Sequence, residues 1–517
     1  MRGTGAVDHE VAVVGGGLTG ICAGIKLGEA GIGFTILERA GDVGGTWRDC
    51  TYPGIAVDVP SAHYSLSFEP NPDWSRTYAP GPEVKAYVDG LMDKYGLWPH
   101  VQLDTNVERA TYEPQHHRWR LDTSRGEITA RFLIGCGGAL TDPRTPDIPG
   151  IEDFAGTIVH TARWNHDHDL ADERTALIGT GASAVQVLPA VAPIVQRIHV
   201  FQRTPIWIFP RADYPIPPWL RTLFRRVPPA QLLLRGVAAA FSDGVLWFGV
   251  VQNRRWQFLT RRAERNARAF VRSQVRDPEL ARKLTPDYGM GCKRPGVSND
   301  YLSTFNRANV ELVTDPIERV EAHGIRTADG TLREIDTLIL ATGYRVFDYG
   351  NIPGFPAIGA AGVELSEFWR EHRHQAYEGV SVPGFPNLFL TFGPYSTTSL
   401  SFLAGTEAGV RHAVRAISEA RRRGATEVEV SREAHDRYFR RVLRRMRGTA
   451  FFNNHCETAN SYYFDARGDA PGLRPNTSVE TWWRSGHYPL VDYAFRLDGA
   501  GVAGDVGDGD RRHEPVA

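Results

Sequence analysis

Two glycine-rich turns, each placed between a short apolar run and a stretch of small residues, constrain the fold of this chain more than any other feature. The first lies in "VAVVGGGLTGICAGI" (residues 11–25) and the second in "TALIGTGASAVQVL" (residues 175–188). An apolar run that ends in a glycine turn and continues as a helix opens a βαβ unit, whose strands are parallel and buried. The pattern therefore predicts an α/β protein with two Rossmann-like dinucleotide-binding domains in series.

The first turn has the spacing of a nucleotide site. Gly15, Gly17 and Gly20 form GxGxxG directly after the apolar run. In that pattern the three glycines permit a tight turn, the approach of a pyrophosphate to the helix N-terminus, and close helix–strand packing. Glu38 ends the next strand, where its carboxylate can accept hydrogen bonds from ribose hydroxyls. The segment "LILATGY" (338–344) resembles the one that closes over FAD in two-dinucleotide-domain flavoproteins, so we expect FAD rather than NAD here.

The second turn is followed by a basic residue at the position that recognises the adenosine ribose. Gly179, Gly181 and Ala184 form GxGxxA, and Arg203 stands after the following strand, where an NAD site would carry an acid. An acid there accepts from a ribose 2′-hydroxyl, whereas arginine can bind a 2′-phosphate bidentately. Thr204 adds a hydroxyl donor. The second domain is therefore predicted to bind NADPH.

Length and local composition divide the chain further. A chain of 517 residues is too long for one compact core. After the proline-rich "YPIPPW" the pattern becomes helical, and the C-terminal residues are rich in glycine and acid, which is typical of disorder. The predicted parts are a FAD-binding domain at 1–145 and 336–498, a NADP-binding domain at 146–211 and 291–335, a helical insertion at 212–290, and a disordered tail at 499–517.

Net charge and hydropathy limit the cellular locations and the binding partners that we expect for this chain. The formal net charge is −1, so no global field attracts nucleic acid or an anionic membrane. The N-terminus has no apolar stretch typical of a signal peptide, and we expect a cytoplasmic protein. The best membrane candidate, residues 232–251, contains Arg235, Asp243 and three glycines. We therefore expect a buried or interfacial helix rather than an integral membrane span. The oligomeric state is not predicted.

Cysteine spacing gives a negative prediction. The five cysteines are scattered, their number is odd, and no CxxC or other metal-ligand spacing occurs. We therefore expect no disulfide framework, no zinc site and no dithiol redox centre. No other metal-ligand cluster and no catalytic triad stands out.

Two longer motifs go beyond a generic fold. "GGTWRDCTYPGIAVD" (44–58) fits [A/G]GxWxxxx[F/Y]P[G/M]xxxD, and "FAGTIVHTARW" (154–164) fits FxGxxxHxxxW. With the two glycine turns they resemble the type I Baeyer–Villiger monooxygenases, and the resemblance runs from about residue 10 to about residue 495. One position departs from the family, which usually has Pro or Asp where this chain has Asn165. The fingerprint residues of the second motif are Phe154, Gly156, His160 and Trp164.

The resemblance implies a reaction. In this family FAD is reduced by NADPH and O₂ then adds to it, giving a flavin peroxide that attacks a ketone carbonyl. The resulting Criegee intermediate rearranges to an ester or lactone. The implied cofactors are FAD and NADPH, and the implied partners are O₂ and a small ketone, which we expect to be hydrophobic or aromatic.

The resemblance also implies roles for residues of this chain. Arg294, in "CKRP", would be the catalytic arginine that stabilises the anionic intermediates, because a guanidinium keeps its charge at neutral pH. Asp58 closes the first motif and would pair with Arg294 beside the cofactor. Lys293 would face the 2′-phosphate together with Arg203.

Further cofactor contacts are expected around both turns. Trp47 and Tyr64 are predicted flavin neighbours. His160 and Trp164 are expected to couple the two domains and to organise the loop on the nicotinamide side. The other predicted cofactor contacts are Thr46, Val107, Thr180, Ser183 and Gln186.

Three other functions remain open from the residues. A related flavin monooxygenase could oxygenate nitrogen or sulfur, a flavin disulfide reductase or oxidase could use the same domains, and a non-catalytic protein could bind the dinucleotides. The complete FxGxxxHxxxW match and the Lys293–Arg294 pair favour oxygenation of a ketone over oxygenation of nitrogen or sulfur. The lack of CxxC argues against a disulfide reductase.

Overall fold

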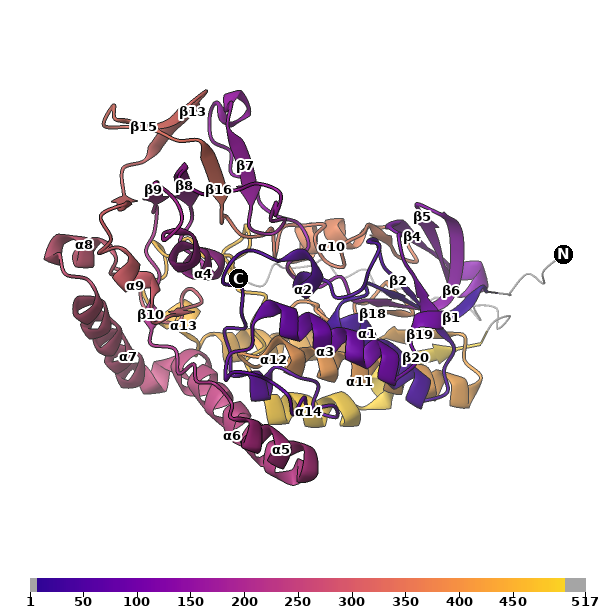
Figure 1. The fold of residues 1–517 in the computed structure, drawn as a ribbon. Coiled ribbons are helices and arrows are strands. Elements are labelled where there is room, and N and C mark those ends of the chain that lie inside the picture. Colours follow the sequence, from indigo (N-terminus) through magenta and orange to yellow (C-terminus); the bar gives the residue numbers. More distant parts are fainter. Residues whose placement is uncertain (1–6, 498–517) are drawn as a thin grey trace.

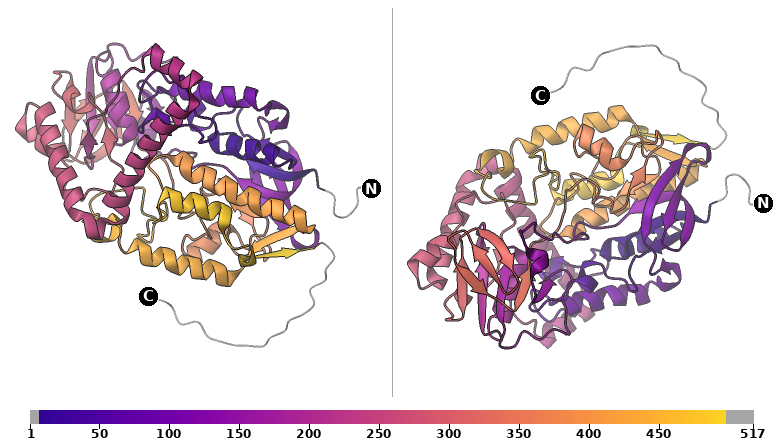
Figure 2. Two further views of the ribbon diagram at one scale, coloured as in Figure 1. Left: turned by 90° about the horizontal axis from the view of Figure 1, so that it is seen from below. Right: turned by 90° about the horizontal axis from the view of Figure 1, so that it is seen from above.

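The computed structural model describes residues 7–497, which form two α/β bodies flanked by an arm of helices (Figures 1 and 2). In Figure 1 the first body lies on the right and the second at the upper left. Each body contains a parallel βαβ unit built on one of the glycine turns. The predicted class, α/β with two Rossmann-type domains and helices between them, is confirmed. The tail predicted at 499–517 lies outside the described residues.

The first body is built on an eight-stranded sheet. Its strands are β1 (His9–Val14), β2 (Phe34–Leu37), β3 (Val101–Gln102), β4 (Val107–Glu113), β5 (Arg118–Thr123), β6 (Gly126–Gly135), β17 (Ala357–Ile358) and β18 (Leu388–Leu390). The order is β17-β4-β5-β6-β1-β2-β3, and β18 pairs with β6 beside this path. β1 is parallel to β2 and β6, whereas β4 and β6 each run antiparallel to β5. The last residues of β1 therefore point the chain into the first glycine turn at the edge where β2 also ends.

Three helices pack on this sheet. They are α1 (Leu18–Glu29), α3 (Gly81–Lys94) and α11 (Phe402–Arg423). Every residue of α1 from Leu18 to Ile25 is buried. This explains the small residues after the turn, because side chains from all three helices share one hydrophobic core with β1 and β2.

The second body contains a five-stranded parallel sheet. Its strands are β7 (Thr157–His160), β8 (Arg174–Ile178), β9 (Arg197–Phe201), β12 (Val310–Val313) and β16 (Thr337–Leu340). The order is β12-β9-β8-β16-β7, and the helix α4 (Ala182–Val191) follows β8. An antiparallel sheet of β13 (Ile317–Glu321), β14 (Gly324–Thr327) and β15 (Leu332–Glu334) lies beside it.

The position of β16 corrects one expected boundary. Residues 336–498 were assigned to the first domain, but β16 pairs with β7 and β8 of the second sheet. The chain leaves that sheet only after Leu340. The apolar run "TLIL" has the same composition as a strand of either sheet, so its partner could not be read from the sequence.

The arm of helices lies within the range predicted as an insertion. It consists of α5 (Pro218–Arg226), α6 (Pro228–Leu246), a π-helical turn at Trp247–Val251, α7 (Asn253–Gln274) and α8 (Pro278–Lys283). Helices α5, α6 and α8 each begin with a proline, which fits the first turn because its missing N–H would have no helical partner. In Figure 1 the arm runs diagonally along the lower left of the molecule.

The apolar segment that was considered as a membrane candidate forms α6. Among the described residues, Pro228–Val251 is the one helical segment long and apolar enough to cross a membrane, and 17% of its most apolar window is buried. Of the two expected alternatives to a span, the structure therefore favours an interfacial helix over a buried one.

The remaining elements are short or belong to the C-terminal part. The helices are α2 (Thr46–Asp49), α9 (Tyr301–Thr304), α10 (Leu365–His372), α12 (Arg432–Met446), α13 (Ala450–Asn453) and α14 (Ser478–His487). The strands are β10 (Ile208–Phe209), β11 (Gly296–Val297), β19 (Glu427–Val430) and β20 (Tyr493–Arg496). The parallel pair of β10 and β11 matters for the site, because it brings the loop of Lys293 and Arg294 beside the chain that follows Arg203.

Candidate active site

The first glycine turn has no room for side chains. Gly15 has φ +113°, and a Cβ there would lie 2.6 Å from the carbonyl oxygen of Cys136. A Cβ on Gly20 would lie 1.8 Å from the carbonyl oxygen of Gly15. At Gly17, the N-cap of α1, no described side chain caps the helix. The N-terminal N–H groups of α1 can therefore serve an anionic ligand.

Glu38 lies directly against this turn. It follows β2, is buried, and accepts a hydrogen bond from the backbone N–H of Gly16 at 2.7 Å. Its other oxygen accepts from the N–H of Ala40 and from Arg48, both at 3.0 Å. Each carboxylate oxygen has two lone pairs, so these bonds orient the group and still allow it to accept from a ribose hydroxyl.

The second turn repeats this geometry. Gly179 has φ +122°, and a Cβ there would lie 2.3 Å from the carbonyl oxygen of Ala341, whereas a Cβ on Gly181 would meet open space. Thr180 donates its hydroxyl proton to the carbonyl of Thr204 at 2.6 Å, which ties the turn to the chain after β9. Ala184 is fully buried behind the turn. The backbone around Gly181 is thus open to a ligand, as the GxGxxA pattern predicts.

Helix α4 contacts the first motif directly. The Tyr52 hydroxyl donates to Gln186 Oε1 at 2.9 Å, and Gln186 Nε2 donates to the carbonyl of Ala56 at 2.9 Å. Gly54 has φ +83°, and a Cβ there would lie 2.6 Å from the carbonyl oxygen of Gln186. The "YPG" of the first motif is therefore a docking surface for the second glycine-turn helix. Gln186, predicted as a cofactor contact, joins the two bodies in the structure.

Two cations stand beside the second turn. Arg203 is exposed and Lys293 is half-buried. Burial lowers the pKa of Lys293 to about 8, and the positive charge of Arg203 adds to the effect. Among residues 7–497 neither cation forms an ion pair with an acid. Two neighbouring cations without a protein anion fit the 2′-phosphate of NADP.

Arg294 and Asp58 form a bidentate ion pair. Arg294 Nε lies 2.7 Å from Asp58 Oδ2, and Nη2 lies 2.8 Å from Oδ1. The two side chains are 29% and 31% exposed, so both remain accessible. The Asp58 carboxylate raises the pKa of Arg294 further above its ordinary value, which keeps the guanidinium charged. Asp58 is half-buried, and its predicted pair with Arg294 is present.

Other groups around Arg294 were not selected from the sequence. Its Nη2 lies 3.5 Å from the carbonyl oxygen of Leu400. Tyr462 and Tyr463 interact electrostatically with the guanidinium, and Tyr462 is exposed. The only sequence signal for these tyrosines was an adjacent aromatic pair in the polar segment "NSYYFDARG". Their position depends on how the C-terminal segment folds back over the "CKRP" loop.

The predicted flavin neighbours of the first motif lie together. Trp47 Nε1 donates to the Tyr64 hydroxyl at 3.0 Å, and the two rings meet edge to face with centroids 5.4 Å apart. Burial raises the pKa of Tyr64, so the hydroxyl stays protonated. Thr46 begins α2 next to Trp47, whereas Val107 is buried at the start of β4. Their cofactor contacts remain predictions, as does that of Ser183, which lies beside the Tyr52 hydroxyl.

His160 ends β7 and links it to the neighbouring strand. Its Nδ1 accepts from the backbone N–H of Ala162 at 3.0 Å, and its Nε2 lies 3.3 Å from the hydroxyl oxygen of Thr342. Burial lowers the pKa of His160. The imidazole is therefore neutral at pH 7, and because Nδ1 accepts, Nε2 carries the proton. His160 thus fixes the "ATG" turn after β16.

The other fingerprint residues pack the second body. A Cβ on Gly156 would lie 2.1 Å from the carbonyl oxygen of Asp336, and the Phe154 ring lies against the same glycine. Trp164 packs on a hydrophobic cluster that also contains Cys50 and Tyr52 of the first motif. The predicted coupling of the two domains by this fingerprint is supported for Trp164 by its packing, and His160 also interacts with the backbone of Arg144, in the range 1–145 predicted for the first domain.

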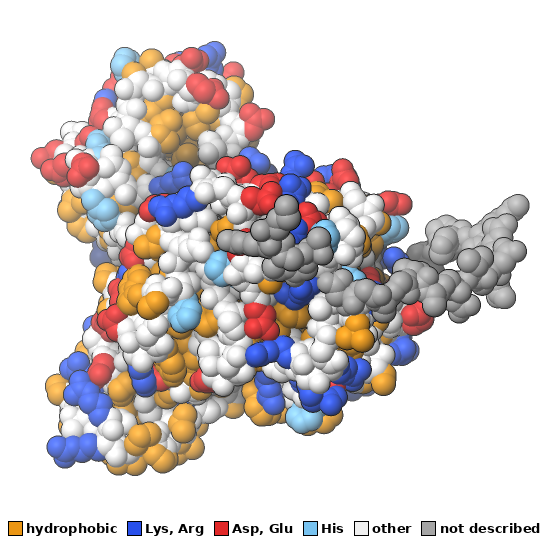
Figure 3. All heavy atoms as spheres, turned by 90° about the vertical axis from the view of Figure 1, so that its right-hand side faces the viewer, with side chains coloured by type: hydrophobic (Ala, Val, Ile, Leu, Met, Phe, Trp, Pro, Cys, Tyr) orange, Lys and Arg blue, Asp and Glu red, His pale blue; other side chains and the backbone are white. Residues whose placement is uncertain are grey.

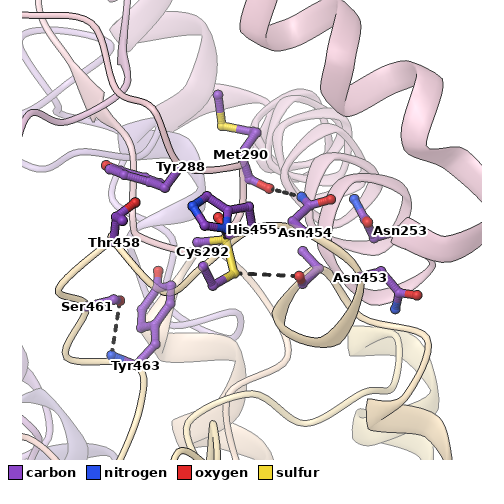
Figure 4. Close-up of a disulfide and its surroundings, with 12 residues drawn as sticks. Asn253, Tyr288, Met290, Cys292, Asn453, Asn454, His455, Thr458, Ser461 and Tyr463 are labelled. Carbon is purple, nitrogen blue, oxygen red and sulfur yellow. Dashed lines mark hydrogen bonds between the residues drawn. A yellow bond between two sulfur atoms is a disulfide. The ribbon is translucent and has the colours of Figure 1, made fainter.

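A disulfide corrects the prediction from cysteine spacing. Cys292 and Cys456 are bonded, with Cα atoms 5.1 Å apart, although 164 residues separate them (Figure 4). Cys292 is fully buried and directly precedes Lys293. Spacing carried no signal because only the folded chain brings the two loops together. The bond ties the "CKRP" loop to the C-terminal segment that carries Tyr462 and Tyr463.

The residues present fit both dinucleotides. The first turn offers a side-chain-free cradle, an uncapped helix and an oriented carboxylate, and the second adds two cations without a protein anion. FAD would be held by the turn at Gly15–Gly20 with Glu38, and NADPH by the turn at Gly179–Gly181 with Arg203 and Lys293. The charged pair of Arg294 and Asp58 joins the end of the first motif to the loop that carries Lys293.

Comparison with known proteins agrees with this arrangement. A family model described as pyridine nucleotide-disulphide oxidoreductase matches residues 12–232. The Baeyer–Villiger monooxygenase of Streptomyces coelicolor is 37% identical over 491 residues, covering 94% of this chain and 93% of the relative. That of Pseudomonas aeruginosa is 36% identical over 455 residues, covering 87% and 84%. The crystal structure of OTEMO with FAD and NADP is 27% identical, with a TM-score of 0.84, and the match covers 95% of this chain and all of that one.

Fold and site together define an oxidoreductase with two dinucleotide-binding domains and a cation, Arg294, that Asp58 holds in place. More narrowly, the chain belongs to the Baeyer–Villiger monooxygenase family, because relatives above 30% identity align over most of its length. It is an FAD- and NADPH-dependent monooxygenase, as its sequence motifs predicted. The alternatives of N- or S-oxygenation and of disulfide reduction are not favoured.

Proposed function

We propose that this enzyme converts a hydrophobic or aromatic ketone to an ester or lactone, with Arg294 as the catalytic residue and Asp58 as its partner. The observation that carries the proposal is the bidentate pair of Arg294 and Asp58, which is accessible to a ligand and includes the last residue of the first motif. Lys293, which directly follows Cys292, would belong to the neighbouring phosphate site.

Bound FAD supplies the redox chemistry, because it takes up the hydride of NADPH and then reacts with O₂. The protein must hold that cofactor, orient the ketone and stabilise negative charge that develops on oxygen. A preorganised cation is suited to this because it needs no reorganisation during the reaction. A single such donor is commonly responsible for about 10²–10³ in rate.

Asp58 determines which edge of the guanidinium is available. The carboxylate occupies Nε and Nη2, so the Nη1 amino group is not used by the ion pair. Asp58 thus supports the proposal as a positioning residue. It fixes the plane of the guanidinium and keeps the pKa of Arg294 high, so the charge is present throughout the working pH range.

The domain division and the location follow as proposals. Residues 1–145 with the chain after the second sheet hold FAD, and 146–211 with 291–340 hold NADPH, while the arm and the loop near Leu400 shape the ketone pocket. A cytoplasmic location is proposed. Since cytosolic proteins rarely keep disulfides, the oxidation state of Cys292 and Cys456 in cells tests that location.

The direct test is oxidation of a panel of cyclic, linear and aryl ketones by the purified holoenzyme. NADPH consumption coupled to a product one oxygen heavier, identified by mass, is the expected result. Consumption with amines or sulfides as the only oxygenated products would contradict ketone oxygenation.

Arg294→Ala tests the catalytic residue. We expect flavin reduction by NADPH to persist while ester formation falls about 10²-fold or more. Arg294→Lys, which keeps a charge but not the bidentate fork, is the matched control and should retain part of the activity. Unchanged ester formation in Arg294→Ala would remove this residue from the mechanism.

A further inference from the structure

Helix α6 has polar side chains turned inward, and most of its large apolar side chains, with the exception of buried Leu246, are exposed. The residues that face the body include buried Gln231 and Ser242. Three residues that face away are Leu233, Val237 and Phe241, which are 71%, 60% and 69% exposed. Their spacing of four residues places them on one side of the helix. A helix of a globular protein normally shows the opposite arrangement.

The two charged residues of α6 explain why this arrangement is stable. Arg235 donates to the carbonyl of Ser65 at 2.8 Å and lies 3.9 Å from Glu407. Asp243 lies beside the side chains of Ser399 and Ser478. Arg235 is therefore bonded within the enzyme, and Asp243 is turned toward two serines of the body, although its Oδ1 is buried without a hydrogen-bond partner among the described residues. They hold α6 along the body and leave no charge on its outer side.

The apolar surface extends beyond α6. Trp219 and Leu223 of α5 are exposed before it, and Phe248, Trp256 and Phe258 are exposed after it. We call the exposed apolar residues of α5, α6 and the start of α7 the arm face. Its members are Trp219, Leu223, Val227, Leu232, Leu233, Leu234, Val237, Phe241, Val245, Phe248, Trp256 and Phe258.

The segment that carries the arm face is strongly basic, although Arg225 is paired with Asp73 of another segment. Between Asp213 and Glu264 the chain contains eight arginines and a single acid, Asp243, which is turned inward. Arg226 precedes α6, and Arg254 and Arg255 follow the π-turn, and all three are exposed. Figure 3 shows hydrophobic and basic side chains side by side on the lowest part of the molecule, where α5 and α6 lie in Figure 1.

We propose that the arm face docks the enzyme on the surface of an anionic lipid bilayer. Apolar side chains with tryptophans would enter the boundary between headgroups and acyl chains, and the flanking arginines would contact lipid phosphates. Because the inner side of α6 is bonded to the body, the helix lies in the plane of the interface and does not span the membrane. The proposal is independent of the substrate and of the catalytic residue.

A second copy of this chain is a poorer occupant for the arm face. A two-fold dimer brings the same patch of both subunits together. The arginines at both ends of α6 would then face arginines, with no exposed acid between Asp213 and Glu264 to compensate them. A bilayer rich in acidic lipid supplies the opposite charge. The overall net charge of −1 conceals this local excess.

The test is co-sedimentation of the FAD-loaded enzyme with vesicles of phosphatidylcholine alone or mixed with phosphatidylglycerol. We expect binding to the anionic vesicles, weaker binding to the neutral ones, and a decrease with added salt. Absence of binding to anionic vesicles at low salt would overturn the proposal.

Variants separate the two parts of the arm face. Leu233→Glu with Phe241→Glu should reduce vesicle binding about tenfold or more, because charge replaces the inserted surface. Arg254→Glu with Arg255→Glu should weaken binding about fivefold per residue, and only to anionic vesicles. Val491→Glu, at an apolar position that is 89% exposed outside the arm, is the matched control and should bind as the parent does.

Each variant is first checked for bound FAD and for its thermal transition, so that a folding defect is recognised. Vesicle binding that survives the Leu233→Glu, Phe241→Glu change would overturn the assignment to α6. The arm face would instead be assigned to a second copy if three results came together. The parent enzyme would be dimeric without lipid and would not bind vesicles, and the Leu233→Glu, Phe241→Glu variant would be monomeric. Static light scattering distinguishes these outcomes.

Discussion

Lys293 carries the charge at the nucleotide sites that is most sensitive to pH. Its pKa is lowered to about 8 by burial and by Arg203, so a large fraction of the side chain loses its proton within the range where enzymes are assayed. Arg294, one residue further on, has the opposite property, because Asp58 raises its pKa. The two adjacent cations therefore differ in their pKa: that of Lys293 is lowered and that of Arg294 is raised.

Binding of NADP⁺ should weaken as the pH rises through 8. Only protonated Lys293 attracts the 2′-phosphate, and a rise in pH removes that proton, so we expect the Kd to increase about tenfold from pH 7.5 to pH 9.5. Titration of the flavin spectrum measures it. NAD⁺, which lacks the 2′-phosphate, should show a flat profile, and Lys293→Met should flatten the profile for NADP⁺. Equal slopes for both nucleotides would contradict this role of Lys293.

At the scale of elements, the first motif and α4 form the joint between the two bodies. Tyr52, Gly54 and Ala56 lie on one loop, and all three contact Gln186. The fixed spacing of "YPG" in the motif is thereby explained by packing as well as by the cofactor. Two features require glycine at position 54. Its φ is +83°, and a Cβ there would lie 2.6 Å from the carbonyl oxygen of Gln186.

Gly54→Ala should destabilise the enzyme more than backbone strain alone. Gly362→Ala is the matched control, since Gly362 has φ +77° and a Cβ there would meet open space. We expect the control to cost about 1 kcal/mol of unfolding free energy. Gly54→Ala should cost about 1–3 kcal/mol more, because Cβ collides with α4. Urea unfolding measures both free energies. Equal losses of unfolding free energy in the two variants would show that the contact between this loop and α4 accommodates a methyl group.

At the scale of the whole molecule, one disulfide bond holds the C-terminal segment against the loop of Arg294. The Cys292–Cys456 disulfide joins the "CKRP" loop to a segment 164 residues away, and the side chain of Asn460 donates to the Thr204 hydroxyl at 2.8 Å nearby. The C-terminal segment is thus fastened to the second body at two places. This brings Tyr462 and Tyr463 to Arg294.

Removing the disulfide should lower stability. Cys292→Ala with Cys456→Ala, or reduction of the parent enzyme by dithiothreitol, should decrease the free energy of unfolding by about 2–4 kcal/mol. The double variant should not respond further to the reductant, which makes it the control. Detection of five free thiols in the denatured, unreduced parent enzyme would show that the bond is not formed.

The sequence by itself determined the parts whose signals are local. A glycine turn between an apolar strand and a small-residue helix specifies its own geometry, because only glycine tolerates the positive φ and close contacts at Gly15 and Gly179. The same holds for the positions of Glu38 and Arg203, whose proposed roles rest on their place after a strand. These residues, and the family, could be read from the sequence because the motifs are contiguous.

Tertiary structure decided whatever depends on chains that are distant in sequence. It paired β16 with the second sheet, bonded Cys292 to Cys456, and placed the tyrosine pair beside Arg294. It also turned Arg235 inward, so that an apolar helix that the sequence described as interrupted by charge has an uncharged outer side. The physical reason is the same in each case. A residue's hydrophobicity, charge or thiol group does not specify which distant residue it will contact, and that partner is fixed only when the chain packs.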